Sequence, residues 1–255
     1  MNLADYKGVL VYIEQRDGEI QKVSLELLGK GKELAEKLGE KLSAVVLGHN
    51  IKALADELIY HGAEKVITVD HEVLKNFTNE PYTKSLTAVI NNEKPAIVLV
   101  GATSIGRDVA PRVSARIHTG LTADCTSLDI DDETRNLMMT RPAFGGNIMA
   151  TIICPDHRPQ MSTVRPGVML KLERNTSNTG DVIDFDADLN AQDLNVEVLE
   201  IVKEDHKKVN IEDAKVLVSA GRGIGSKENM SPLYDLADEL KGEVSASRAD
   251  IDNAW

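Results

Sequence analysis

Short apolar runs alternate with amphipathic stretches along the first half of the chain. The apolar runs predict buried strands at residues 8–14, 42–48, 65–70 and 96–100. Stretches with apolar residues at three- and four-residue spacing predict helices between Ser24 and Gly39, from 53 to Gly62, at 82–91 and at 105–117. Strands that are apolar throughout belong in parallel sheets covered by helices on both faces. The pattern therefore predicts an α/β domain with a doubly wound, mostly parallel sheet.

Local signals set the expected helix ends. Ser24 is the expected N-cap of the first helix, because a serine oxygen accepts a hydrogen bond from a free N–H at a helix start. Gly39 is expected to end that helix. Pro111 is expected near the first turn of its helix or at a bend, since proline has no N–H to donate.

The pattern changes from Cys125 onward. Residues 137–140, 147–154 and 160–164 predict strands without helices between them, and hence an antiparallel addition to the sheet. An acidic loop is expected at 180–194, a strand leading out at 195–203 and a charged linker at 204–209. The expected domains are therefore residues 1–203 and 210–255.

The end of the chain has the pattern of a single βαβ unit. Residues 216–218 are apolar, 219–225 form a glycine-rich turn, 233–240 have helical spacing and 244–248 form a short run. Ligands of open α/β sheets bind beyond the carboxyl ends of the strands. This unit places Arg222, Ser247 and Arg248 there. The glycine spacing is not G-x-G-x-x-G, so a dinucleotide site and a tight turn with a surface arginine remain equally open.

The amino-acid composition argues against several classes of function. A formal net charge of -12 argues against non-specific nucleic-acid binding, and three phenylalanines and one tryptophan provide no platform for stacking bases. The two cysteines, Cys125 and Cys154, form no disulfide framework or iron–sulfur motif and fit a reducing cytoplasm. The first residues lack the basic and apolar regions of a signal peptide, so none is expected, and no apolar run of about 20 residues predicts a membrane span.

Two turns in the first domain carry candidate chemistry. Residues 101–108 (GATSIGRD) follow a strand and open a helix, where N–H groups bind phosphate, or where Ser104 simply caps the helix. Residues 140–147 (TRPAFGGN) place Arg141 before two glycines, as an anion ligand or an exposed residue of a hairpin. The six histidines lack metal-ligand spacing, so no metal is expected. No G-x-S-x-G elbow supports a hydrolase.

The final residues resemble the FAD-binding domain of electron-transfer flavoprotein alpha subunits. Residues 219–223, 228–229, 234–237 and 247–249 carry the resemblance. It implies FAD as the cofactor, with Arg222, Gly223, Ser247 and Arg248 around the flavin and its pyrophosphate. The arginine at 248 would lie against the flavin ring and raise its reduction potential. The family continues beyond the position of Trp255, so the resemblance implies an FAD domain that is cut short.

The first domain is similar to the N-terminal domain of the same family, which resembles the adenine-nucleotide-binding fold of its beta subunit. Residues 140–147 and 162–167 are most similar to alpha subunits of the anaerobic, flavin-bifurcating type. The resemblance implies a subunit interface, part of it near a second flavin held mainly by the beta subunit. The residues assigned to this interface are Arg107, Asp108, Arg112, Arg141, Phe144 and Arg165.

The resemblance implies an electron carrier with no catalytic residue of its own. The expected partners are a beta subunit and an acyl-CoA dehydrogenase, together with NADH and ferredoxin or flavodoxin in a bifurcating complex. One alternative is a cofactor-free scaffold that only docks the beta subunit. Another, an adenine-nucleotide-binding hydrolase or stress-protein-like module, fits the first domain but leaves residues 215–255 unexplained.

Overall fold

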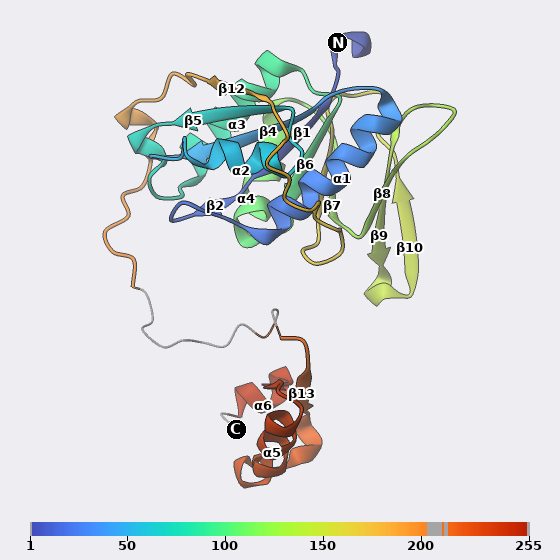
Figure 1. The fold of residues 1–255 in the computed structure, drawn as a ribbon, viewed down its shortest axis with the longest axis vertical. Coiled ribbons are helices and arrows are strands. Elements are labelled where there is room, and N and C mark those ends of the chain that lie inside the picture. Colours follow the sequence, from blue (N-terminus) through green and yellow to red (C-terminus); the bar gives the residue numbers. More distant parts are fainter. Residues whose placement is uncertain (1, 203–210, 212–213, 254–255) are drawn as a thin grey trace. The chain divides into compact units, whose positions relative to one another are not determined.

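The computed structural model describes residues 2–202, 211 and 214–253 (Figure 1). The chain divides into two compact units, Met1–Val198 and Leu199–Trp255. The linker expected at 204–209 lies outside the described residues.

The first unit is built on a seven-stranded sheet with the order β12-β5-β4-β1-β6-β11-β7. All six pairings are parallel. The predicted α/β class with a mostly parallel sheet is confirmed. The strands are β1 (Val9–Ile13), β4 (Leu42–Gly48), β5 (Lys65–Asp70), β6 (Ile97–Gly101), β7 (Leu121–Cys125), β11 (Gln160–Val164) and β12 (Asp181–Asp184).

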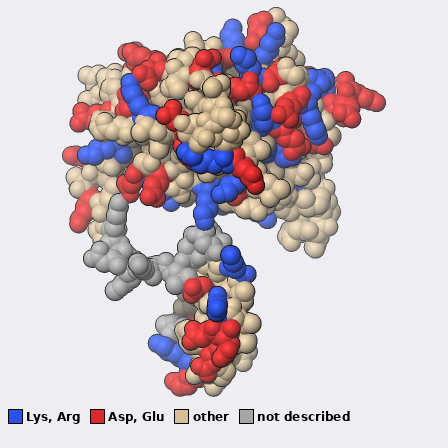
Figure 2. Space-filling model, in the orientation of Figure 1, with Lys and Arg blue, Asp and Glu red and all other residues tan. Residues whose placement is uncertain are grey.

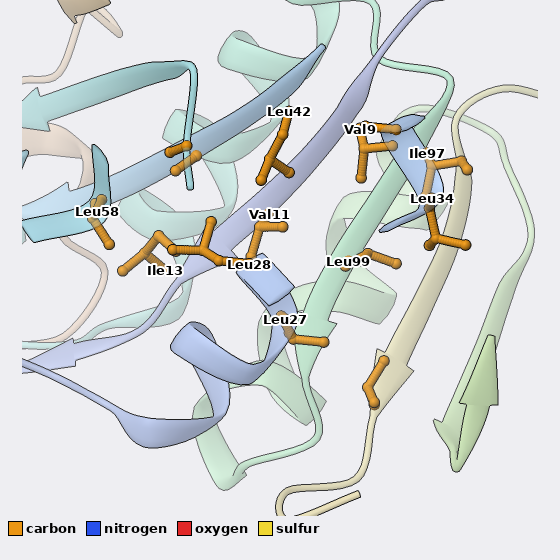
Figure 3. Close-up of a cluster of buried hydrophobic side chains, with 14 of the residues drawn as sticks. Val9, Val11, Ile13, Leu27, Leu28, Leu34, Leu42, Leu58, Ile97 and Leu99 are labelled. Carbon is orange, nitrogen blue, oxygen red and sulfur yellow. The ribbon is translucent and has the colours of Figure 1, made fainter. Parts of the chain in front are cut away.

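Four helices cover the two faces of this sheet. They are α1 (Lys22–Leu38), α2 (Leu54–Tyr60), α3 (Asn79–Glu93) and α4 (Ser104–Arg116). On one face, Leu27, Leu28 and Leu34 of α1 pack on Val9 and Val11 of β1 (Figure 3). On the other face, α3 and α4 pack on the alternate residues of the same strands, so the strands are buried on both sides, as their apolar sequences require.

The first helix begins earlier than its sequence suggests. Gln21 is its N-cap and makes no side-chain capping bond, while Ser24 lies inside the helix and is buried. The Ser24 hydroxyl instead accepts the backbone N–H of Glu14 at 2.9 Å. The prediction of Ser24 as the cap is therefore wrong, because a distant backbone donor competes for its oxygen. Gly39 ends the helix in the left-handed conformation (φ 66°), as predicted.

Three strands form a separate antiparallel sheet with the order β10-β9-β8. They are β8 (Ser127–Ile130), β9 (Leu137–Ala143) and β10 (Ile148–Ile152). Leu128 and Met139 of this sheet join the core on the α1 face. The prediction that residues 160–164 belong to the antiparallel addition is wrong, because β11 lies in the main sheet, parallel to β6 and β7.

The end of the first unit also differs from its predicted form. Residues 181–184, expected in a loop, form the edge strand β12 parallel to β5. Residues 195–202, expected as a strand, form none. Between β11 and β12, residues 165–180 cross α1 and α2. A Cβ on Gly29 of α1 would lie 2.1 Å from the carbonyl oxygen of Leu170, so glycine is required at this crossing.

Pro111 lies in the interior of α4 rather than in its first turn. The helix runs without interruption across it from Ser104 to Arg116. One backbone hydrogen bond is therefore missing on the exposed side of α4, because proline lacks the donor.

The second unit is the predicted strand–helix–strand. Strands β13 (Leu217–Ala220) and β14 (Glu243–Ala246) pair in parallel and α5 (Ser231–Glu239) connects them. Two short 3-10 turns, η6 (Arg222–Ile224) and η7 (Lys227–Met230), precede α5, and α6 (Arg248–Asp252) follows β14. Among the described residues of this unit, the buried apolar side chains are few, namely Val218, Ala220, Met230 and Ala237.

Candidate functional site

The first candidate site lies at the carboxyl ends of β13 and β14. The register sets Ala220 opposite Ala246, so the chain leaves the two strands side by side. Arg222 and Arg248 each follow two residues after this pair. The N–H of Ser247 donates to the carbonyl oxygen of Ala220 at 2.9 Å and joins the two strand ends.

The glycine-rich turn has room for a ligand. Gly221 has φ -128°, a backbone conformation open to any residue, and Gly223 is not in the left-handed region either. A Cβ on either glycine would meet no atom of the chain within 4 Å. Neither the backbone nor the packing of this unit therefore requires glycine at these two positions. Close approach of a ligand to their N–H groups would require it, and a pyrophosphate makes such an approach.

Both arginines of this site present their guanidinium groups to solvent. The Arg248 side chain is 93% exposed, with its Nε 3.4 Å from Asp252. Arg222 is also exposed. Two cations at adjacent strand ends beside a bare backbone suit a large, anionic ligand with a planar ring. The residues present therefore fit FAD.

Ser247 holds the buried Asp250 side chain, a role that the sequence pattern did not indicate. Its hydroxyl donates to Oδ2 of Asp250 at 2.7 Å, and its N–H lies 3.2 Å from the same oxygen. Asp250 is 0% exposed, and its Oδ1 is buried without a hydrogen-bond partner among the described residues. Ser247 thus stands at the start of α6 with its proton given to Asp250, which leaves its oxygen free only to accept. Its contact with a cofactor stays a prediction.

A second candidate site in the first unit centres on Asp124, a residue that the sequence did not single out. Arg165 donates to both carboxylate oxygens, from Nε at 3.1 Å and from Nη2 at 2.6 Å. Nη2 of Arg107 lies 3.9 Å from Oδ1 of the same residue. Arg141 is close enough for its charge to act on Asp124. Residues from β7, α4, β9 and the end of β11 are thus brought together, which we call the arginine cluster (Arg107, Arg141, Arg165 and Asp124).

The arginine cluster contains three arginines and one aspartate, so it carries a net positive charge. The hydrogen bond from Arg165 is the main reason why the pKa of Asp124 lies below its ordinary value. The charges of Arg107 and Arg141 lower that pKa further. Nε of Arg141 is buried and has no hydrogen-bond partner among the described residues. Three cations thus face one anion, and one of the cations has a donor still to satisfy.

The neighbouring thiol takes no part in this chemistry. Burial raises the pKa of the Cys125 thiol to about 11. It therefore remains protonated at neutral pH and is a poor nucleophile.

Asp108 and Arg112 do not join the arginine cluster, although they follow Arg107 closely in sequence. Nε of Arg112 donates to Asp108 at 3.1 Å along α4, and its Nη1 lies 4.0 Å from Glu80 of α3. The hydrogen bond from Arg112 is the main reason why the pKa of Asp108 is lowered. The two residues form part of the contact between α3 and α4, and an interface role for them stays a prediction.

Phe144 lies at the tip of the hairpin formed by β9 and β10, and its side chain is 82% exposed. Gly145 and Gly146 follow it with φ of 70° and 91°, which shapes the turn. The edge strand β10 and the residue after it expose further apolar side chains, namely Ile148, Met149, Ile152 and Ile153. Apolar exposure along a free sheet edge is typical of a protein–protein contact surface. We call residues 143–153 the apolar hairpin.

The turn at residues 101–108 is capped by one of its own side chains. Thr103, rather than Ser104, caps α4 by accepting the N–H of Gly106 at 3.0 Å. The Thr103 hydroxyl donates to the carboxylate of Glu14, which is only 2% exposed. The other oxygen of this carboxylate accepts from Arg16 at 2.7 Å, and phosphate binding at the start of α4 stays a prediction. The sequence could not reveal the contact between Thr103 and Glu14, because Glu14 lies at the end of a different strand.

Figure 2 shows acidic and basic side chains intermixed over the visible face of the first unit. Among the residues that the structure describes, no group of three or more histidine, cysteine or acidic side chains is arranged to hold a metal ion. None of the described helices is long and apolar enough to cross a membrane.

Comparison with known proteins identifies similar sequences over the whole chain. The family described as Electron transfer flavoprotein domain matches residues 9–190, and the Electron transfer flavoprotein FAD-binding domain matches residues 210–255. The electron transfer flavoprotein subunit alpha of Clostridium acetobutylicum is 56% identical over 100% of this chain and 76% of its own length.

Two further relatives carry more specific names. The acryloyl-CoA reductase electron transfer subunit beta of Anaerotignum propionicum is 43% identical over 100% of this chain and 77% of its own length. Subunit LctC of the lactate dehydrogenase (NAD(+),ferredoxin) of Acetobacterium woodii is 40% identical over 98% of this chain and 59% of its own length.

Proposed function

Because the chain belongs to the electron transfer flavoprotein alpha subunits, we propose that it carries electrons, through a bound FAD, between a beta subunit and an acyl-CoA dehydrogenase. The observation that carries this proposal is the turn after β13. There, the packing of the chain does not require glycine at positions 221 and 223, since a Cβ at either would meet no atom within 4 Å. Arg222 and Arg248, at the same end of the two strands, face solvent.

The residues at the ends of β13 and β14 would divide the binding of FAD between them. The N–H groups of residues 221–223 and the guanidinium of Arg222 would hold the pyrophosphate, since both are donors suited to phosphate oxygens. Arg248 would hold the flavin ring and favour negative charge on it. The cofactor supplies the ability to accept and release electrons. The protein's own residues bind it, orient it and set its reduction potential.

A bifurcating complex is the finer form of this proposal. LctC belongs to an enzyme named for NAD(+) and ferredoxin, and a second relative serves acryloyl-CoA reductase. In such a complex the two electrons of NADH would divide, one going to ferredoxin or flavodoxin and one to the dehydrogenase through this subunit. Anaerobic metabolism in the cytoplasm is the setting that we propose, in keeping with the free thiols of Cys125 and Cys154.

The beta subunit would dock on the apolar hairpin and the arginine cluster. The apolar hairpin supplies exposed hydrophobic area and a free strand edge at β10. The arginine cluster supplies uncompensated positive charge, with Arg141 and Arg165 toward a second flavin held mainly by the beta subunit. Arg107 reaches the cluster, which supports its interface assignment.

Flavin content and reduction potential test the proposal. The complete subunit, purified alone after incubation with excess FAD and removal of the unbound cofactor, is expected to show flavin absorption bands in proportion to this polypeptide. Gly221→Val should remove that flavin while changing the thermal unfolding of the apoprotein little, because a Cβ at this position would meet no atom of the chain within 4 Å. Arg248→Ala should retain the flavin at a lower potential.

A folded complete subunit without flavin bands after this treatment would reject electron carriage and favour the cofactor-free scaffold. Flavin retained at full occupancy in Gly221→Val would reject the placement of the pyrophosphate at this turn.

A further inference from the structure

Asp124 is held rigidly by the backbone around it. Its φ of 61° places it in the left-handed region, which aspartate and asparagine tolerate better than most residues. Its N–H donates to the Thr163 hydroxyl at 2.9 Å, beside an irregularity in the pairing of β7 with β11. The N–H of Arg165 donates to the Cys125 carbonyl oxygen at 2.9 Å. Both partners of the Asp124–Arg165 pair are therefore fixed at their backbones before their side chains meet.

The Asp124 carboxylate holds one edge of the Arg165 guanidinium. Nε and Nη2 are both engaged, while the side chain remains 45% exposed. Within the part of the chain that the structure describes, Nη1 donates to no other group. A guanidinium is planar, so fixing the Nε–Nη2 edge also fixes the direction of the Nη1 donors.

The negative charge of Asp124 does not by itself explain why an aspartate lies within the arginine cluster. Three arginines gather around Asp124, and its negative charge reduces the attraction of the arginine cluster for an anion. An aspartate that weakens the charge of an anion site needs a compensating role. Orientation of a long and otherwise mobile side chain is such a role, because preorganised donors bind more tightly than free ones.

We propose that Asp124 is a positioning residue, which turns the Nη1 edge of Arg165 toward an anionic oxygen of the nucleotide that the beta subunit presents to the arginine cluster. This inference rests on the proposed function and adds the residue that orients the Arg165 guanidinium for binding the nucleotide. The oxygen belongs either to a nucleotide phosphate or to the flavin ring, and both offer the acceptor that the Nη1 donors require.

The direction in which Asp124→Asn changes the affinity for the anion distinguishes a positioning role from a purely electrostatic effect. Asp124→Asn removes the negative charge but suits the left-handed backbone. Simple electrostatics predicts that an anion then binds more tightly. Positioning predicts that it binds about 10-fold more weakly, the loss expected for one charge-assisted hydrogen bond. Arg165→Lys keeps the charge, cannot make the two-pronged contact, and should lose as much.

The test is a double-mutant cycle in the complete complex with its beta subunit. The dissociation constants of AMP and of FAD at the beta-subunit site are measured in wild type, Asp124→Asn, Arg165→Ala and the double variant. We expect Asp124→Asn to weaken binding about 10-fold when Arg165 is present and less than about 2-fold in the Arg165→Ala background. Glu57→Gln is the control, because Glu57 also pairs with an arginine of the first unit, accepting from Nε of Arg174 on both carboxylate oxygens.

Each outcome has a separate meaning. Weaker binding of both AMP and FAD supports positioning toward phosphate, and weaker binding of FAD alone, with a shifted potential of that flavin, supports positioning toward the ring. Unchanged or tighter binding in Asp124→Asn, or equal losses in both backgrounds, overturns the proposal. If Arg165→Ala itself has no effect on nucleotide affinity or flavin potential, the arginine cluster's place beside the second flavin fails as well.

Discussion

Thr103 and Ser104 are neighbours with the same functional group, yet only Thr103 caps α4. The Thr103 oxygen accepts the N–H of Gly106 and its proton is donated to buried Glu14. Thr103→Ala should therefore lower the free energy of unfolding by about 1–2 kcal/mol, the usual value for a lost cap. Ser104→Ala should change it by less than about 0.5 kcal/mol. Urea denaturation of the two variants measures the difference, and equal effects would contradict this assignment.

Asp124 gives the stability of the first unit a pH dependence. Its pKa is lower in the folded protein than its ordinary value of 3.8. The stabilisation is then fully present well above pH 3.8 and is lost as the pH falls through the folded pKa. The difference in melting temperature between wild type and Asp124→Asn should be constant from pH 7 to 5 and shrink below pH 4. A difference that grows on acidification would show that the sign is wrong.

The residue-scale features that sequence reasoning missed share one cause. Asp124 and Arg165 are far apart in sequence and meet only because β7 and β11 are adjacent strands. Glu14 and Thr103 meet in the same way at the ends of β1 and β6. No local pattern marks such pairs. In contrast, the Arg222 and Arg248 positions were visible, since a resemblance to a family and a short βαβ unit both pointed to them.

At the scale of elements, the sequence predicted buried strands more accurately than exposed ones. The central strands β4 and β5 have the predicted bounds, because residues buried on both faces must be apolar throughout. Strand β12 was missed because its side chains are all exposed at the sheet edge and its sequence is acidic. The direction of β11 was missed because a strand's own sequence does not state which neighbours it will pair with.

The crossing of residues 165–180 over α1 depends on one missing side chain. Gly29→Ala would place a methyl group 2.1 Å from the Leu170 carbonyl oxygen, so the crossing segment must move. We expect a loss of about 1–3 kcal/mol in unfolding free energy, as for other overpacked sites. Limited proteolysis should detect faster cleavage within 165–180. Gly120→Ala is a useful comparison, because the nearest atom to its added methyl group is Sγ of Cys154 at 3.6 Å, an ordinary contact distance. Equal proteolysis of wild type and Gly29→Ala would contradict the close packing.

The apolar hairpin should matter for pairing and not for folding. Phe144→Asp replaces a side chain that is 82% exposed, so the isolated subunit should unfold within about 0.5 kcal/mol of wild type. Pairing with the beta subunit should weaken by about 10-fold or more, because a charge would be buried against an apolar surface. Leu170→Asp, at a similarly exposed residue outside the hairpin, is the control for sedimentation or calorimetric titration. Unaltered pairing in Phe144→Asp would exclude Phe144 from the interface.

At the scale of the molecule, the two units differ greatly in the size of their interiors. The first has an extensive core on each face of its sheet, whereas the second encloses only a few apolar side chains. Cofactor binding should therefore be felt mainly by the second unit. In calorimetry of the complete subunit, FAD at about 100 times its dissociation constant should stabilise only the second unit, by about 2.7 kcal/mol. An equal rise in both transitions would mean that the units do not unfold separately.

The exposed edge of β10 has a consequence for how the protein is made. A free strand edge that exposes Ile148, Met149 and Ile152 can pair with strands of other polypeptides as well as with the beta subunit. An orphan subunit would then be prone to self-adhesion and to capture by chaperones or proteases. Cells that use this protein would gain from synthesising both subunits in equal amounts and at the same place, so that the edge is covered soon after it folds.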